Sequence, residues 1–187
     1  MNDTIRSIIN RRSIRMFEPE QIRDNELEAV LQAGAYAPSA ANQQPWHFTV
    51  IQNKDVMKRI TQDTKDYFMF SENLRFKQIA DDPSFNPFHG APTCIVISGD
   101  EKALMPHADC AAAAQNMLIA ASSLGLGSCW VNIFLHLFNG SKGEAWKSEL
   151  DIPTGYKPFY SIVLGYKTTI GNPEPLPRRN NIVNYIK

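Results

Sequence analysis

Three arginines and a serine fall within five residues near the N-terminus, in the run RRSIR from Arg11 to Arg15. If this run is extended, Arg11, Ser13 and Arg15 lie on one side, because successive side chains of a strand alternate. Two guanidinium forks that flank a hydroxyl suit a phosphate, since each fork can donate two parallel hydrogen bonds. The other interpretation is a solvated helix end, where arginine complements the helix dipole. On this run alone the second interpretation is favoured.

The run PSAANQQPWHF, residues 38–48, places several uncharged polar side chains next to Trp46. Donors and acceptors without charge, beside an aromatic ring, suit a planar heterocycle whose edge carries carbonyl groups and ring nitrogens. The run is also compatible with an ordinary loop between a helix and a strand, whose polar side chains cap the backbone.

A second arginine pair, Arg178 and Arg179, follows two prolines in the C-terminal tail. Alone, such a pair is typical of a solvent-facing segment or of the rim of an interface. The two arginine clusters could converge on one phosphate, although their spacing does not require it. The chain has 19 basic and 19 acidic residues, and this zero net charge argues against a nucleic-acid binder.

Other catalytic patterns are weak in this sequence. The three cysteines form no CxxC pair and favour reduced cytosolic thiols, and the four histidines are scattered without metal-ligand spacing, so we expect no metal site. The run GLGS at 125–128 follows an expected helix rather than a strand, which predicts a helix C-cap and not a phosphate loop. No serine or second histidine is spaced to form a nucleophile unit with His107, and we expect no catalytic acid–base pair.

The sequence favours a soluble, cytoplasmic protein that does not bind membranes. The first 12 residues lack the apolar stretch of a signal peptide. The longest apolar stretch begins at Ala111, contains Gln115 and Asn116, and is too short to span a bilayer.

Apolar spacing predicts five helices. Asp3 is expected to cap the first, with Ile5, Ile8 and Ile9 on one face, and Asp24 to cap a second over 24–37 that Pro38 stops. A third is expected at 54–66, and a central buried helix from His107 to Leu124, apolar nearly all round. Ser141 and Glu144 predict a capping box that opens a last helix ending at Leu150.

Four core strands are expected, at 47–52, 93–98, 129–134 and 160–166, and residues 81–92 are expected to form a loop. Helices and strands in this mixed order predict a single domain over residues 1–187, of the α+β or three-layer α/β class. The tail ends in a strand-like IVNYI at 182–186 with few apolar partners of its own. We therefore expect it to lie across a second subunit.

RRSIRMF, a capped helix and APSAANQQPWHF together closely resemble the FMN-dependent nitroreductase family. The resemblance continues through GAPTCIVI, SLGLGSCWVNIF and the PRRN tail, and so covers nearly the whole chain. It implies a three-layer α/β/α fold with a mixed, mostly antiparallel sheet of four strands and a C-terminal strand exchanged with the partner subunit. It also implies a homodimer with two FMN molecules at the interface, each contacted by both subunits.

The resemblance also implies roles for individual residues. Arg11 and Ser13 would hold the phosphate and ribityl end, Arg15 would reach the pyrimidine edge of the ring, and Arg12 would be peripheral. Either arginine of the tail pair would close the phosphate site. The remaining expected contacts are the ring-lining residues of the other subunit and a turn whose backbone N–H donates to flavin N5: Pro38, Ser39 and Asn42, and Asn132 and Ile133.

The implied activity is that of an FMN-dependent NAD(P)H oxidoreductase. Nitroaromatics, quinones or similar acceptors would be reduced in a ping-pong, two-electron cycle through N5, with NADH or NADPH as donor. One alternative is a carrier or sensor that binds FMN with little turnover, and another is a different reaction such as reductive dehalogenation or flavin breakdown. Residues 66–90 would form the wall over the substrate, where Asn73, Phe85 and Phe88 are candidate contacts and simple packing is the alternative.

Overall fold

The computed structural model describes residues 1–168, 173–180 and 182–187. Its sheet has the strand order β1-β2-β4-β3, and all three strand pairs are antiparallel. The central strands carry continuous, mostly apolar runs that are buried, at 93–99 in β2 and 161–165 in β4, for example at the pair Ile95 and Ile162. The strands are β1 (Trp46–Ile51), β2 (Thr93–Asp100), β3 (Gly127–Trp130) and β4 (Tyr156–Gly165).

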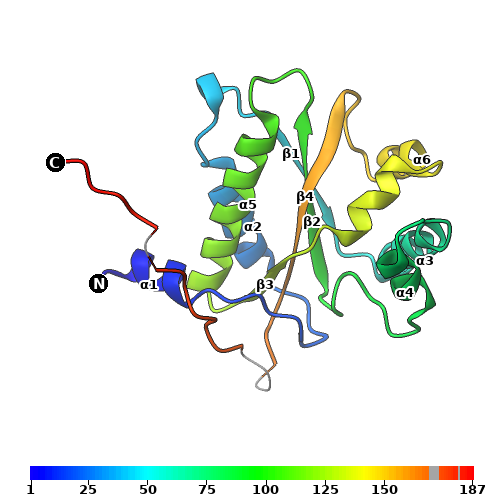
Figure 1. Cartoon of the computed structure of the whole chain (residues 1–187), viewed down its shortest axis with the longest axis horizontal. Helices are drawn as coiled ribbons and strands as arrows, with labels where there is room; N and C mark the ends of the chain where they lie inside the picture. Colours follow the sequence, from blue (N-terminus) through cyan, green and yellow to red (C-terminus); the bar gives the residue numbers. More distant parts are fainter. Residues whose placement is uncertain (169–172, 181) are drawn as a thin grey trace.

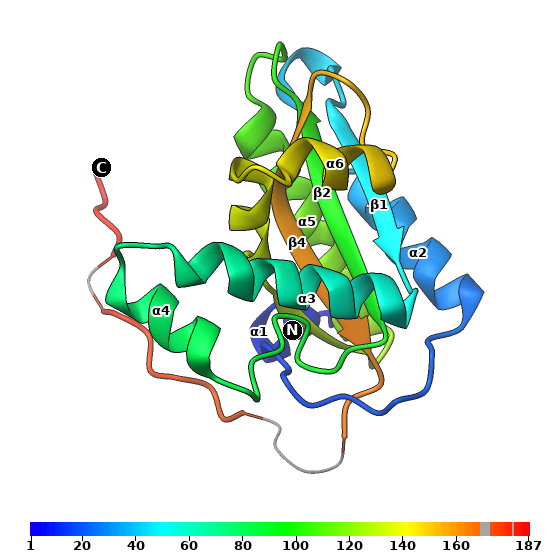
Figure 2. The same ribbon diagram turned by 90° about the vertical axis from the view of Figure 1, so that its right-hand side faces the viewer.

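Helices cover both faces of this sheet (Figures 1 and 2). One side carries α1 (Asp3–Asn10), α2 (Asp24–Ala35) and α5 (Pro106–Ser123), and the other carries α3 (Lys54–Met69), α4 (Leu74–Asp81) and α6 (Gly143–Glu149). Two short 3-10 helices, η1 (Ala40–Asn42) and η2 (Ile133–Asn139), precede β1 and follow β3. The expected three-layer α/β/α arrangement is confirmed.

The central helix α5 packs between the sheet and α2. Its buried residues include Cys110, Met117 and Leu118, as expected for a helix that is apolar nearly all round. A Cβ atom on Gly34 would lie within 2.2 Å of Met117 Cε, so a glycine is needed where α2 approaches α5. Gly125, with φ of 78°, follows the end of α5, which confirms the expected glycine C-cap.

The structure corrects several expected helix ends. Asn2 caps α1 in place of Asp3, since its Oδ1 accepts from the Ile5 N–H at 3.0 Å. The prediction that Ser141 and Glu144 form a capping box is wrong. The helix α6 begins at Gly143, and Glu144 pairs with Lys147 at 2.8 Å. The helix α4 was missed.

Two expected strands differ from the structure. Of the strand expected at 129–134, only Cys129 and Trp130 belong to a strand, because β3 begins earlier, at Gly127, and the chain turns into η2 from Ile133. The described residues 182–187 have no regular secondary structure, and the side chains of Ile182, Tyr185 and Ile186 are exposed. The exchange of a C-terminal strand with a partner therefore stays a prediction. In the described part of the chain, no helix combines the length and apolar character needed to cross a bilayer.

Candidate functional site

The RRSIR run lies extended along the edge of β3, directly after α1. The Ile14 N–H donates to the Ser128 carbonyl at 2.9 Å, and Ser13 forms a parallel bridge with Ser128. Ile14 is buried, and a Cβ on Gly127 would come within 3.0 Å of its Cγ2 atom, so the glycine permits this close approach. The extended interpretation of the run is confirmed.

Side chains of the run gather around the Cys129 thiol of β3. Burial raises the pKa of this thiol, and the charges of Arg15 and Arg11 and a hydrogen bond with Ser13 oppose that shift. Arg11, Ser13 and Arg15 therefore act on one thiol, as the alternation of an extended segment predicts. The thiol itself is buried and unreactive in character, as expected from the sequence.

A cavity of about 310 Å³ lies beside this run and carries three cations, Arg11, Arg12 and Lys167. The hydroxyl-bearing residues Ser122 and Ser128 also line it, and its described lining residues include no carboxylate. Cationic and hydroxyl donors without an acid are the donor set that suits a phosphate. Lys167 was missed in the sequence because it follows the last strand as a single lysine, with no motif around it.

Arg11 and Arg12 differ in how many hydrogen bonds their guanidinium groups make within the chain. Arg12 Nη1 donates to the Ile9 carbonyl at 2.7 Å and to the Arg11 carbonyl at 2.8 Å, which ties it to the end of α1. Within the described residues, the Arg11 guanidinium makes no hydrogen bond or ion pair. Arg11 is therefore the freer donor for a bound anion.

Arg15 is exposed and reaches toward the loop that precedes β2. Burial lowers the pKa of the half-buried His89 in this loop, and the charge of Arg15 lowers it further. The structure thus brings His89 to the site, which the sequence did not indicate because no ligand-like spacing surrounds it.

The PSAANQQP loop is anchored at the start of α5. The Ala40 N–H donates to Asp109 Oδ1 at 3.1 Å. Within the loop, Ser39 Oγ accepts from the Gln44 N–H at 2.9 Å, and Asn42 Oδ1 accepts from Gln44 Nε2 at 3.1 Å. Pro38 and Asn42 are exposed and Ser39 is half-buried.

The helix α5 separates this loop from the RRSIR run within one chain. Asp109 holds the loop near the start of α5, whereas Ser122, near its end, lines the cavity of Arg11. Thirteen residues of α-helix rise by about 20 Å. Figure 1 shows α1 at one end of α5 and the light-blue segment that leads into β1 at the other. The structure does not bring the two runs together in one chain.

The Asn132 side chain fixes the turn that follows β3. Its Oδ1 accepts from Trp130 Nε1 at 3.1 Å and from the Ser161 N–H at 3.0 Å. Ile133 is the first residue of η2, and the first N–H groups of a helix have no partner inside it. The turn can thus present the backbone N–H of Ile133 as a donor, three residues beyond Trp130. This donor follows β3, the strand along which RRSIR lies.

Arg178 and Arg179 are exposed, and neither lines the cavity of Arg11. Pro173 and Pro175 of the same tail do line it, so the tail leaves the cavity shortly before the two arginines. The expected convergence of both arginine clusters is not present in the described part of the single chain.

The model of the nitroreductase family matches residues 8–166, which is most of the chain. This chain belongs to the nitroreductase family. An Archaeoglobus fulgidus relative, provisionally named NADH dehydrogenase/NAD(P)H nitroreductase, is 33% identical over 171 residues, covering 89% of this chain and 86% of the relative.

Two crystal structures of family members are similar over the full length of both chains. One is a nitroreductase with bound FMN from Bacteroides fragilis, 29% identical with a TM-score of 0.95. The other is a nitroreductase with bound FMN from Desulfitobacterium hafniense, 29% identical with a TM-score of 0.89. Each alignment covers 100% of this chain and 100% of the other.

In this nitroreductase-family chain, two of the three candidate contact residues within 66–90 have structural roles in the fold. Phe88 is buried and packs on Phe134 with ring centroids 5.0 Å apart, so packing accounts for it. Asn73 caps α4, because its Oδ1 accepts from the Arg75 N–H at 2.9 Å. Phe85 is half-buried and stays a candidate contact.

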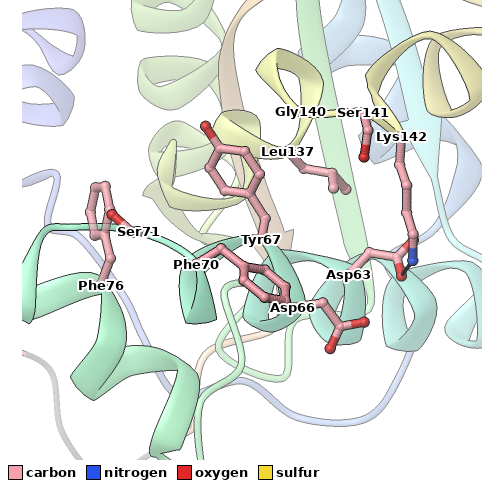
Figure 3. A pocket seen from close by; sticks show the side chains of 10 residues that line it. All are labelled: Asp63, Asp66, Tyr67, Phe70, Ser71, Phe76, Leu137, Gly140, Ser141 and Lys142. Carbon is pink, nitrogen blue, oxygen red and sulfur yellow. Dashed lines mark hydrogen bonds and ion pairs between the residues drawn. The ribbon is translucent and has the colours of Figure 1, made fainter.

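A second cavity, of about 430 Å³, lies between α3, α4 and the end of η2 (Figure 3). Tyr67, Phe70 and Phe76 form its aromatic side, and Lys142 pairs with Asp63 on the other. None of the expected flavin-contacting residues lines this cavity.

Proposed function

We propose that this chain is an FMN-dependent NAD(P)H oxidoreductase that reduces nitroaromatics, quinones or similar acceptors. The observation that carries the proposal is the cavity of three cations beside the extended RRSIR run, in a chain of the nitroreductase family. The two similar structures with bound FMN support FMN as the source of the phosphate that such a cavity would hold. Residues 1–187 would form one FMN-binding domain.

The phosphate end of FMN would lie at Arg11 and Ser13, with Arg12 behind them at the end of α1. Arg15 would face the pyrimidine edge of the ring, where a positive charge favours the anionic reduced flavin. The N–H of Ile133 would donate to N5, held by the turn that Asn132 fixes.

A homodimer would complete the site. The PSAANQQP loop and the RRSIR run lie at opposite ends of α5, and a two-fold axis across α5 would bring the loop of one subunit to the run of the other. Pro38, Ser39 and Asn42 would then line the ring bound by the partner, and Arg178 or Arg179 would close a phosphate site. The exposed isoleucines of α1, Ile5, Ile8 and Ile9, support an apolar interface on this side of the molecule.

FMN held by these residues would supply two-electron hydride chemistry at N5. The chain itself would bind the cofactor, orient it and hold charge at the ring, and the proposed reaction needs no acid–base pair of side chains. This division of roles fits a ping-pong cycle in which NADH or NADPH gives up its hydride and leaves as the oxidised nicotinamide before the acceptor enters the same pocket. Three unpaired buried cysteines support a cytoplasmic location.

The test is a visible absorption spectrum of the purified protein, with the released chromophore identified by mass. We expect FMN that stays bound through gel filtration in a species of dimer size. Adding NADH or NADPH without oxygen should bleach the flavin spectrum, and a nitroaromatic or quinone should restore it. Bleaching without rapid restoration would favour an FMN carrier, and a protein that takes up no FMN would refute the proposal.

A further inference from the structure

The PSAANQQP loop holds an unfavourable backbone conformation. Ala41, Asn42 and Gln44 have φ angles of 50°, 55° and 47°, in the left-handed region that side chains with a Cβ rarely adopt. Each such residue costs about 1 kcal/mol or more, and it persists only where surrounding contacts hold it. Three within four residues mark a loop whose shape depends on the contacts that hold it, both within the loop and outside it.

Few contacts outside the loop can impose that shape. The Leu104 N–H donates to Gln43 Oε1 at 2.8 Å, and the Asp100 N–H donates to the Pro45 carbonyl at 3.0 Å. Asp109 Oδ1 accepts from the Ala40 N–H at 3.1 Å, and among the described residues it is the only side-chain group outside the loop that accepts from the loop backbone. The Ala40 bond lies directly before the first strained residue.

Asp109 is itself an unusual group in this fold. Its residue is 6% exposed, and its Oδ2 atom has no hydrogen-bond partner within the described chain. Burying a carboxylate costs free energy unless hydrogen bonds or ion pairs to the carboxylate offset that cost. Its position in the first turn of α5 offsets part of that cost through the helix dipole. A neutral side chain would fill the same place in α5 without this cost, so packing alone does not explain the aspartate.

We propose that Asp109 is a positioning residue for the flavin, acting in trans. Its carboxylate holds Ala40 and thereby fixes the strained loop in the shape in which Ser39 and Asn42 line the ring bound by the partner subunit. This inference rests on the proposed function, and it adds that the affinity for FMN in one subunit depends on a buried carboxylate of the other.

The first test compares Asp109→Ala and Asp109→Asn with the wild-type protein. Asp109→Ala should accelerate amide hydrogen exchange at residues 40–44 and weaken FMN binding about tenfold, as expected for losing a hydrogen bond to a charged group. Asp109→Asn keeps an acceptor oxygen and should give a smaller effect. The matched control is Asp55→Asn, an exposed carboxylate in the first turn of α3, which should change neither measurement. The visible circular dichroism of bound FMN should change only in the Asp109 variants.

The second test uses a mixed dimer, made by coexpression with two affinity tags. One subunit carries Arg11→Ala and the other Asp109→Ala. If Asp109 acts in trans, the Asp109→Ala subunit binds FMN with its own Arg11 and with the intact loop of its partner. The mixed dimer should then hold one FMN with wild-type affinity, although neither variant homodimer holds any at that affinity.

Two results would overturn the inference. Asp109→Ala with wild-type exchange at residues 40–44 and wild-type FMN affinity would show that the carboxylate does not hold the loop. A mixed dimer with no site of wild-type affinity would show that Asp109 does not act in trans. Failure of the proposed function looks different, because the wild-type protein itself would then bind no FMN.

Discussion

Replacing Arg11 by alanine removes one of the three cations that line the cavity beside RRSIR. The Arg11 guanidinium makes no hydrogen bond or ion pair within the described residues, so the substitution breaks no existing bond of that side chain. A hydrogen bond to a charged group contributes about 1.5–3 kcal/mol to binding. Losing it should raise the dissociation constant of FMN by about 10- to 150-fold. Arg12→Ala should have a smaller effect on affinity, because part of its guanidinium is already bonded to the end of α1.

The assay is a titration that follows the quenching of flavin fluorescence on binding, with FMN and riboflavin compared as ligands. Riboflavin has the same ring and ribityl chain but no phosphate, so Arg11→Ala should leave its binding unchanged. Arg6→Ala is the matched control, since Arg6 lies five residues earlier, is exposed and pairs with Asp3. Raising the salt concentration should weaken FMN binding to the wild-type protein more than to Arg11→Ala.

The reasoning would be refuted by either of two results. If Arg11→Ala weakens riboflavin as much as FMN, the arginine supports the fold or the ring and not the phosphate. If Arg6→Ala weakens FMN as much as Arg11→Ala does, the effect comes from general surface charge and the cavity is not the phosphate site.

Three further predictions concern stability and assembly. Hydrogen bonds from Arg23 and Tyr166 lower the pKa of the buried Glu26 to about 2, so the stability that Glu26 contributes is present above pH 4.5 and is lost as the pH falls toward 2. In acid unfolding followed by circular dichroism, Glu26→Gln should lose this part of the pH dependence. An unfolding curve identical to that of the wild-type protein would contradict the assignment. Burial and the charge of Arg15 lower the pKa of His89, so the unfolded chain binds more protons than the folded one and stability falls as the pH drops through about 6.5. Arg15→Gln should raise the pKa of His89 in an NMR titration. An unchanged His89 pKa would show that the Arg15 charge does not act on His89. Ile8→Asp removes an exposed isoleucine of α1 and should raise the dimer dissociation constant about tenfold or more by sedimentation, whereas an unaltered dimer would exclude α1 from the interface.

Local pattern was enough to predict the central elements of the fold. The continuous apolar run at 93–98 is β2, whose neighbours on both sides leave its residues buried. The helix expected from His107 to Leu124 is α5, displaced by one residue at each end. Period and burial agree in both segments, because their packing is dominated by the core itself.

Tertiary contacts decided the features that the sequence did not reveal. The apolar run 129–134 has strand character, yet the Asn132 amide bonds Trp130 and Ser161 and turns the chain into η2. Asp109 holds Ala40 across 69 residues of sequence, and no local signal indicates such a contact. The extended shape of RRSIR was one of two interpretations, and the run alone favoured the other. Its place beside Lys167 was not foreseeable, because Lys167 belongs to the far end of the chain.

The zero net charge of the chain and its proposed binding of a phosphate are compatible for a physical reason. Charges separated by more than about 8 Å are largely screened at physiological ionic strength, so distant acidic groups do little to cancel a local cluster. The cavity of Arg11, Arg12 and Lys167 has no carboxylate among its described lining residues. Its cations would face a bound anion in a confined space, where the effective dielectric constant is lower than in water. The proposed selectivity for one phosphate would therefore follow from where three cations lie, and the overall charge balance of 19 basic and 19 acidic residues would disfavour longer polyanions.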